Sequence, residues 1–190
     1  MHRCEWTKND SLMNSYHDHE WGVPLHDDKK LFEFLVLDAF QAGLSWKTIL
    51  YKRENFRKAF DNFDYYKISE FKQNEIDKLL TDNGIIRNKL KIDATISNAR
   101  AFINIIEEYR SFDKYIWQFV NYKTIINSCK TIKDVTVTSK ESDLMSKDLK
   151  ERGFKFVGST ICYAFMQAAG MVNDHTTDCF RYKELITQYK

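Results

Sequence analysis

The sequence predicts an all-α protein, and three observations support this fold class. Apolar residues recur at intervals of three and four over most of the 190 residues, which is the spacing of a helix face. Alternation typical of strands is scarce, and only one proline and six glycines interrupt the chain. Hydrophobic residues make up 43% of the composition, which is enough for one compact core at this length. We expect a single domain over 1–180 and a disordered or loosely attached C-terminal tail over 181–190.

The first two helices are marked by capping residues and a glycine stop. Asp27 can cap a helix over 29–42, because its side chain can accept hydrogen bonds from the free amides of the first turn. Gly43 ends that helix, since glycine readily takes the left-handed conformation that follows helices. Ser45 can cap the next helix, which we expect over 46–60.

The middle of the chain contains the most regular helical pattern. After a turn at 63–66 we expect a helix that ends near Gly84, where a glycine can take the left-handed conformation. The clearest helix covers 87–109, because its apolar residues step by four and three. The stripe that we predict to be core consists of Ile92, Ile96, Ala99, Ile103 and Ile106.

The last third of the chain is less regular. We expect a short helix over 113–120, whereas residues 121–138 are polar and β-branched and fit no element firmly. The motif at 138–141 resembles a capping box and predicts a charged helix that runs to Arg152. A last helix is expected to open at 159 or 160 and to run to 170.

Charge and hydropathy exclude several classes of protein. The 29 basic and 27 acidic side chains give a net charge of +2, so a nucleic-acid partner must be recognised by local groups. No stretch reaches the roughly 18 to 20 apolar residues of a membrane helix, and the start lacks the apolar core of a signal peptide. We therefore expect a cytoplasmic protein without a membrane partner, and the sequence indicates no obligatory protein partner.

Cysteines and histidines near the two ends of the chain form the first candidate site. His175 and Cys179 are four residues apart, so both can face one side of a helical turn, as metal chelation requires. Cys4 and His17 would complete a tetrahedron for which zinc is the natural ion, and four protein ligands favour a structural role. The alternatives are unrelated buried thiols with surface histidines, or the catalytic metal site of a hydrolase.

The glycine-containing turn at 153–158 is the second candidate site. Such a turn exposes backbone N–H groups at the start of the following helix, where they can bind an anion such as a DNA phosphate. Lys150, Arg152 and Lys155 add positive charge beside it. The alternative is an ordinary connection between two helices.

The helix corner over 40–46 is the third candidate site. It can present Leu44 as an apolar wedge and Trp46 as a stacking surface, while Asp38 one turn upstream supplies a hydrogen-bond acceptor. Each aromatic residue taken alone could instead be core, and Asp38 could merely terminate its helix. Further aromatic candidates for the same pocket are Trp6, Tyr16 and Trp21.

Several motifs make the chain resemble one known family from about residue 3 to residue 179. It is similar to the 3-methyladenine DNA glycosylase I family, the constitutive Tag-type enzymes of bacterial alkylation repair. The motifs that carry the resemblance include Arg3-Cys4, Tyr16-His17-Asp18, Glu20-Trp21-Gly22-Val23-Pro24, Gln41-Ala42-Gly43-Leu44-Ser45-Trp46, Arg152-Gly153-Phe154-Lys155-Phe156-Val157-Gly158 and Val172-Asn173-Asp174-His175.

The resemblance implies a fold and a function. It implies a helix-hairpin-helix glycosylase with two helical lobes and a base pocket between them, which flips a damaged base from double-stranded DNA and hydrolyses its N-glycosidic bond. Strand cleavage is not expected, since Thr160 stands where bifunctional relatives carry a lysine. The resemblance implies three sets of site residues. The zinc ligands are Cys4, His17, His175 and Cys179, and the base pocket consists of Trp6, Tyr16, Trp21, Asp38 and Trp46. The DNA contacts are Gln41, Gly43, Leu44, Ser45, Lys155, Gly158, Ser159 and Thr160.

Two positions depart from the family pattern. Asp38 stands where the family has a base-binding glutamate, and Met13 replaces a common aromatic residue. The catalytic candidates are Asp38 and Asp174. The acid at 174 is offset by one position from that of the bifunctional relatives, and orientation of His175 is an equal alternative role for it. We therefore expect excision of cationic alkylated purines, chiefly 3-methyladenine. The alternatives are a non-cleaving protein that binds alkylation damage, or a member with altered lesion specificity.

Overall fold

The computed structural model describes residues 1–188 and confirms the all-α fold class. The segments of β-structure are two residues long, and none of the helices described has both the length and the apolar character that crossing a membrane requires. The α-helices are α1 (Ser11–His19), α2 (Asp28–Gln41), α3 (Trp46–Ala59), α4 (Tyr65–Ser69), α5 (Gln73–Thr81), α6 (Lys89–Tyr109), α7 (Phe112–Trp117), α8 (Lys140–Glu151), α9 (Ser159–Ala168) and α10 (Phe180–Gln188).

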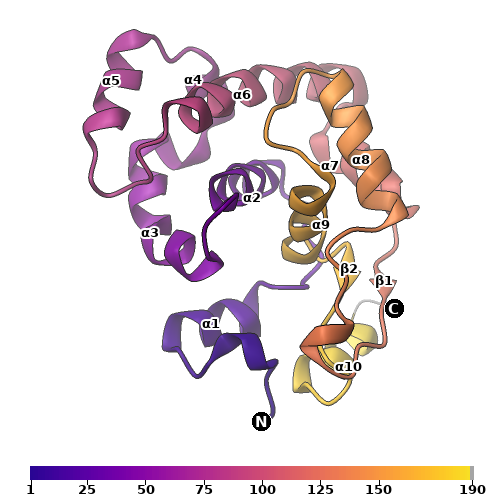
Figure 1. Cartoon of the computed structure of the whole chain (residues 1–190). Coiled ribbons are helices and arrows are strands. Elements are labelled where there is room, and N and C mark those ends of the chain that lie inside the picture. The colour runs from indigo at the N-terminus through magenta and orange to yellow at the C-terminus, as the bar shows by residue number, and fades with distance from the viewer. Residues whose placement is uncertain (189–190) are drawn as a thin grey trace.

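Helix α2 forms the centre of the molecule. Every residue from Leu31 to Phe40 is buried, so this helix has no solvent-facing side over ten residues. Helices α3, α6, α7 and α9 pack around it, and Figure 1 shows α2 enclosed by its neighbours. Because α2 is buried on all sides, a polar residue on it must face either a partner or a cavity.

Capping residues begin α2 and α3 as predicted, whereas α1, which Asp10 caps, was not predicted. Asp27 accepts a hydrogen bond from the Lys30 amide at 2.8 Å, and Ser45 accepts one from the Thr48 amide at 3.2 Å. Gly43 has a φ of +79°, so it ends α2 in the left-handed conformation that favours glycine. These local signals fix both ends of the corner between α2 and α3.

Two expected helices are divided in the structure. The helix expected after 63–66 is two helices, α4 and α5, because the side chain of Glu75 accepts the Lys72 amide at 2.9 Å and starts a new helix there. Gly84 does not adopt a positive φ, contrary to expectation. The segment 113–120 consists of α7 followed by a 3₁₀ turn.

The expectation of a loose tail over 181–190 was wrong for 181–188. These residues belong to α10, which buries Leu185 to 4% exposure. The Phe180 amide donates to the His2 carbonyl at 3.0 Å, so the end of the chain is fixed to its beginning. Residues 189–190 lie outside the described part of the chain.

The segment 121–138 crosses the molecule and ties two distant regions together. Strand β1 (Ile125–Ile126) pairs in parallel with β2 (Val172–Asn173). The Thr177 amide then donates to the Cys129 carbonyl at 2.8 Å. This pairing brings the segment beside the C-terminal metal-ligand motif, which no local sequence signal predicts.

A buried lysine holds the end of α2. The ammonium of Lys91 on α6 donates to the carbonyls of Phe40 and Ala42 at 2.8 and 2.7 Å. We expect Lys91→Met to lower the free energy of unfolding by about 2 kcal/mol, because two carbonyls that close α2 lose their charged donor. Urea unfolding would measure this, and Lys89→Met, on the exposed side of the same helix, is the control. Equal stability of both variants would contradict the assignment.

Candidate active site and metal centre

Four buried side chains join the two ends of the chain in one cluster. Cys4, His17, His175 and Cys179 are each at most 2% exposed, and their ligand atoms lie within 4.8 Å of one another. His175 Nδ1 is 3.2 Å from His17 Nε2, and Cys179 Sγ is 3.5 and 3.4 Å from these two nitrogens. Cys4 Sγ is 3.6 Å from His175 Nδ1. The four predicted ligands are therefore brought together.

Hydrogen bonds orient both histidine rings toward the cluster. His17 Nδ1 is 2.8 Å from a carboxylate oxygen of Asp18, which Arg3 holds through a two-pronged ion pair. His175 Nε2 is 3.1 Å from the carbonyl oxygen of Trp21. Because these outer nitrogens face acceptors, the inner nitrogens are left with lone pairs that point at the two thiols.

The cluster fits a tetrahedral metal ion. Zinc bonds of about 2.0 Å to nitrogen and about 2.3 Å to sulfur give ligand separations of about 3.3 Å for two nitrogens and about 3.6 Å for nitrogen and sulfur. The separations observed match both values. Hydrogen bonds from Cys4 and the histidines lower the pKa of Cys179, which favours the thiolate that a metal binds. The burial of all four ligands closes the site to a substrate.

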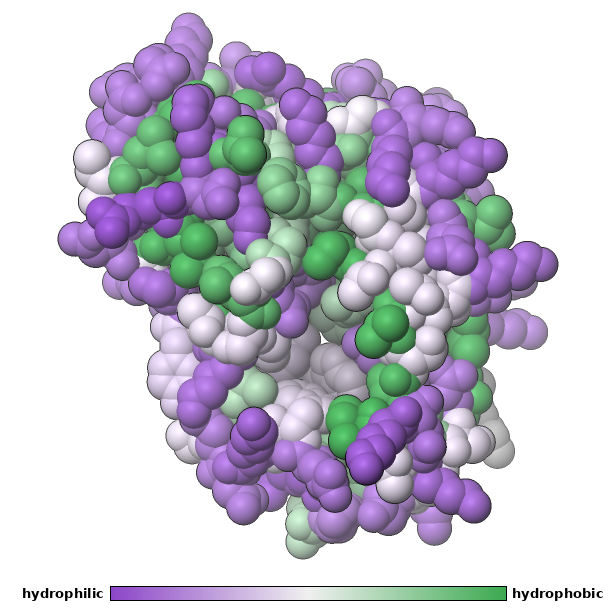
Figure 2. Space-filling view, in the orientation of Figure 1, coloured by the Kyte–Doolittle hydropathy of each residue, from purple (hydrophilic) through white to green (hydrophobic). Residues whose placement is uncertain are grey.

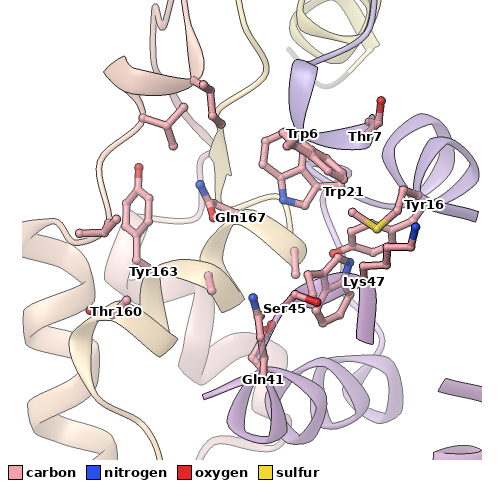
Figure 3. Close-up of a pocket in the computed structure, with 18 of the residues that line it drawn as sticks. Trp6, Thr7, Tyr16, Trp21, Gln41, Ser45, Lys47, Thr160, Tyr163 and Gln167 are labelled. Atoms are coloured by element: carbon pink, nitrogen blue, oxygen red, sulfur yellow. The ribbon is translucent and has the colours of Figure 1, made fainter. Parts of the chain in front are cut away.

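A cavity of about 660 Å³ opens beside this cluster. Figure 2 shows it as a hollow in the surface, and Figure 3 shows its labelled side chains. Its size suits a small flat molecule. All five residues predicted for the base pocket line it, namely Trp6, Tyr16, Trp21, Asp38 and Trp46.

The metal cluster supports one wall of this cavity. The ring of Trp21 lies edge-on to His175 with centroids 4.6 Å apart, and Trp6 lies 5.4 Å from His17. Trp6 and Trp21 also contact each other at 5.1 Å. The aromatic wall of the cavity therefore depends on the position of the two histidine ligands.

Three buried polar atoms that belong to residues lining this cavity have no hydrogen-bond partner in the described protein. They are the indole nitrogens of Trp6 and Trp46 and the Oδ2 atom of Asp38. An unpaired buried polar atom is costly, so such atoms usually mark the place of a ligand or water. The matching ligand offers hydrogen-bond acceptors to two indoles and a donor to one carboxylate.

Asp38 is the acidic group of the cavity. It is 2% exposed, and burial raises its pKa well above the ordinary aspartate value, although the nearby charge of Arg53 opposes the shift. Arg53 itself is paired with Glu33 at 2.7 Å and with Glu20 at 2.7 Å. A cationic ligand would supply the charge partner that Asp38 lacks.

The corner between α2 and α3 borders the cavity. Gln41 and Ser45 line it, whereas Gly43 and Leu44 project beyond it. Leu44 is 41% exposed, so its side chain is available for contacts outside the protein. Hydrophobic residues also gather at the opposite edge, where Ile132 and Val137 are 41% and 66% exposed. The opening is thus bordered by apolar side chains on two sides (Figure 2).

The turn between α8 and α9 is held rigidly. Asn98 on α6 accepts from the Lys155 amide at 2.8 Å and donates to the Lys155 carbonyl at 3.0 Å. Gly158 precedes α9, so the first amides of that helix are free to bind an anion. Thr160 lines the cavity, whereas the Ser159 hydroxyl donates to Asp143 at 2.5 Å. The Ser159 hydroxyl therefore has no free hydrogen for an anion, whereas the backbone amide is available.

The expectation that Arg152 adds charge for a phosphate was wrong. Its guanidinium is paired with Asp148 and Glu108, both at 2.7 Å. It also lies over the ring of Tyr109 at 5.1 Å. These contacts occupy its donors within the protein, whereas the side chains of Lys150 and Lys155 are exposed.

Asp174 lies outside the cavity lining and does not orient His175. Its carboxylate accepts hydrogen bonds from Asn127, Tyr163 and Gln167. The ring of His175 is oriented instead by the Trp21 carbonyl. The expected alternative role for Asp174, orientation of a metal ligand, is therefore not supported by these contacts.

Sequence reasoning missed several residues of the cavity. On α9 the missed residues follow Thr160 at intervals of three and four, so the helical period alone could have found them. The segment around 132–137 carried no such signal, because it reaches the cavity through tertiary contacts. The missed lining residues are Thr7, Lys8, Asp10, Met13, Lys47, Ile132, Val135, Thr136, Val137, Tyr163, Ala164, Gln167 and Ala168.

Comparison with known proteins gives a consistent result. The family model described as methyladenine glycosylase matches residues 6–182. DNA-3-methyladenine glycosylase 1 of Escherichia coli (strain K12) is 47% identical over 182 residues, with 96% of this chain and 97% of that protein covered. A crystal structure of a 3-methyladenine DNA glycosylase I has a TM-score of 0.92 at 47% identity, covering 94% of this chain and 98% of the other.

A second solved structure shows a relative with a ligand. It is a variant of 3-methyladenine DNA glycosylase I in complex with 3-methyladenine, with a TM-score of 0.91, 36% identity, and coverage of 95% of this chain and 97% of the other. An aromatic cavity with one buried carboxylate in a helical fold offers the groups that a flat, positively charged ring would contact. The chain belongs to the methyladenine glycosylase family.

Proposed function

We propose that this protein is a DNA-3-methyladenine glycosylase of base-excision repair. It binds alkylated double-stranded DNA, flips a cationic purine into the cavity and hydrolyses its N-glycosidic bond without cutting the strand. The observation that carries the proposal is the cavity in which Trp6, Trp46 and Asp38 leave two donors and one acceptor unpaired. The family match and the relatives' names support the same activity. We place the reaction in the bacterial cytosol, where the DNA is.

Excision of a cationic purine depends more on recognition of its charge than on acid catalysis. A purine alkylated at N3 is a cation and already a good leaving group, so the cavity has to distinguish charge. Indole faces favour a cation over neutral adenine by about 1 to 2 kcal/mol per desolvated contact. The Asp38 carboxylate attracts the cation and can accept from its exocyclic amine. As the bond breaks, the base leaves neutral and positive charge moves to the deoxyribose. Water then adds to its C1′ atom and releases one proton to the solvent.

The cluster of Cys4, His17, His175 and Cys179 is proposed to hold one structural zinc ion. The match of ligand separations to a tetrahedron and the burial of all four residues support this role. When bound, zinc would supply a rigid link between the chain ends and no chemistry to the reaction. The residues themselves position Trp6 and Trp21 at the cavity wall.

The DNA is proposed to lie across the cavity opening. Leu44 would fill the gap left by the flipped base, with Gln41, Gly43 and Ser45 beside it. The amides of Gly158, Ser159 and Thr160 at the start of α9, with the side chain of Lys155, would bind a backbone phosphate.

Leu44→Ala is expected to reduce excision from duplex DNA about tenfold, because the wedge that stabilises the flipped state is shortened. Affinity for the free base should stay within about twofold, since Leu44 lies outside the cavity. Single-turnover excision and base binding measure the two effects. Leu144→Ala, another exposed leucine, is the control. Wild-type excision by the Leu44 variant would exclude the wedge.

The reaction type is tested on methylated duplex DNA. We expect this protein to create sites that break only after alkali treatment, with the strands intact before it. Strand breaks without alkali would contradict a hydrolase that lacks a Schiff-base lysine. Damage-specific binding without alkali-labile sites would instead support a non-cleaving damage-binding protein.

A further inference from the structure

Asp174 is a buried carboxylate that the proposed reaction leaves unexplained. It is 2% exposed and lies between the metal-ligand motif and helix α9. One oxygen, Oδ1, accepts from Asn127 Nδ2 at 2.6 Å. The other, Oδ2, accepts from the Tyr163 hydroxyl at 2.9 Å and from Gln167 Nε2 at 2.7 Å. Both oxygens thus accept hydrogen bonds from protein donors, and Asp174 is absent from the cavity lining.

The hydrogen bond between Gln167 and Asp174 fixes which end of the Gln167 amide faces Asp174. A glutamine side chain has one NH₂ group and one carbonyl oxygen, and only the NH₂ group can donate to a carboxylate. With Nε2 fixed on Asp174, the amide cannot rotate to exchange its two ends. Gln167 lines the cavity, and Figure 3 shows it with Tyr163 on the α9 side, across from Trp6 and Trp21. This orientation leaves the carbonyl oxygen without a protein partner, and the second hydrogen of Nε2 also stays free.

We propose that Asp174 is a positioning residue that holds the carbonyl oxygen of Gln167 ready as a second acceptor for the alkylated purine. This inference rests on the proposed function. The amino group of an adenine carries two hydrogens, and Asp38 supplies an acceptor for one of them. A carbonyl dipole held in place favours a cation without reorganising when the ligand arrives. The role of Asp174 is then to select the orientation of Gln167 rather than to touch the substrate.

Three variants separate positioning from general support of the fold. Gln167→Leu removes the acceptor, and Asp174→Asn releases the constraint on the amide. Asn127→Ala is the matched control, because Asn127 donates to Oδ1 and lies outside the cavity lining. All three proteins are compared for bound metal and for Tm, so that a folding defect is seen directly.

The first measurement is the affinity for free 3-methyladenine, which is determined from the quenching of tryptophan fluorescence in the cavity. We expect Gln167→Leu to weaken binding about fivefold, the effect of losing one hydrogen bond to the neutral free base. Asp174→Asn should weaken it at least about threefold, because the amide then spends part of its time reversed. Asn127→Ala should stay within about twofold of the wild type.

Excision of the base from DNA by the same proteins separates this inference from the function on which it rests. If the wild type releases the base and Gln167→Leu binds and releases it equally well, the inference alone is overturned. If Asn127→Ala loses as much affinity as Asp174→Asn, Asp174 merely supports the fold and the inference also fails. If the wild type binds the base without releasing it, excision is excluded while the binding series still decides the role of Gln167. Failure to bind the base at all overturns both.

Discussion

Asp38→Asn is expected to remove most base excision while making the free protein more stable. The substitution keeps the size of the side chain but removes the negative charge that faces a cationic base. A hydrogen bond to a charged group contributes about 1.5 to 3 kcal/mol, so the single-turnover rate should fall at least about tenfold and up to more than a hundredfold. Asp93→Asn, at the surface of α6, is the control and should keep the wild-type rate.

Asp38→Asn is expected to stabilise the protein without a ligand, because it removes a buried charge that has no partner there. In the empty cavity Asp38 is a buried acid with an unpaired oxygen and a pKa raised by burial. Between the ordinary and the raised pKa, the native state binds more protons than the unfolded state, so the free energy of unfolding falls as pH rises. The Asp38→Asn variant does not show this fall in the free energy of unfolding, because asparagine does not titrate. Its advantage should grow as pH rises from about 4 and should reach about 1 to 3 kcal/mol.

The titration of Asp38 also affects activity, which should rise with pH whereas stability falls. Excision needs the ionised carboxylate, so wild-type activity should fall as pH is lowered through the raised pKa of Asp38. The asparagine variant should lack this step. Urea unfolding and excision rates, each measured across pH, check both statements. An asparagine variant that is less stable than the wild type and equally active would contradict the assignment of Asp38.

The second large effect is expected from the metal cluster. Cys179→Ser should abolish metal binding and lower the free energy of unfolding by at least about 4 kcal/mol, because a structural zinc site contributes its binding energy to folding. Unfolding and refolding the wild type in a chelator should have the same effect. Excision should be lost in both cases, since His17 and His175 support Trp6 and Trp21 at the cavity wall.

A cysteine outside the cluster provides the control. Cys129→Ser, at a buried position that does not join the cluster, should keep the metal and lose about 1 kcal/mol. Metal analysis and thermal unfolding measure both variants. A Cys179→Ser protein with a normal metal content, or an apoprotein with an unchanged Tm, would show that these four residues are not a structural metal site.

The sequence contains enough local information to predict much of this fold. Caps at Asp27 and Ser45, the glycine at 43 and the periodicity of 87–109 place the central helices. These signals depend on neighbours within a few residues along the chain. Helix α10 was missed because its stability comes from tertiary packing, as the burial of Leu185 and the contact of Phe180 with His2 show.

The residues of the candidate site could be predicted where their spacing in the sequence or a family motif identifies them. The cluster of Cys4, His17, His175 and Cys179 follows from ligand chemistry once the ends of the chain meet. The pairing of Arg152 with Asp148, four residues upstream, follows a helical spacing that the sequence contains. The second partner of Arg152 and the role of Asp174 could not be predicted, because they depend on side chains far away in sequence. Arg152 is neutralised by Glu108, 44 residues away, and Asp174 is bound by Asn127, 47 residues away.

The most direct test of the central claim is mass spectrometry of the free bases that this protein releases from methylated duplex DNA. We expect 3-methyladenine to be the main product of the wild type, with release strongly reduced by Asp38→Asn and by Trp46→Ala. That result would establish excision and show that an aspartate can serve at this position. If no base is released by a protein that holds its metal and still binds the damaged DNA, the protein is not a glycosylase for this lesion.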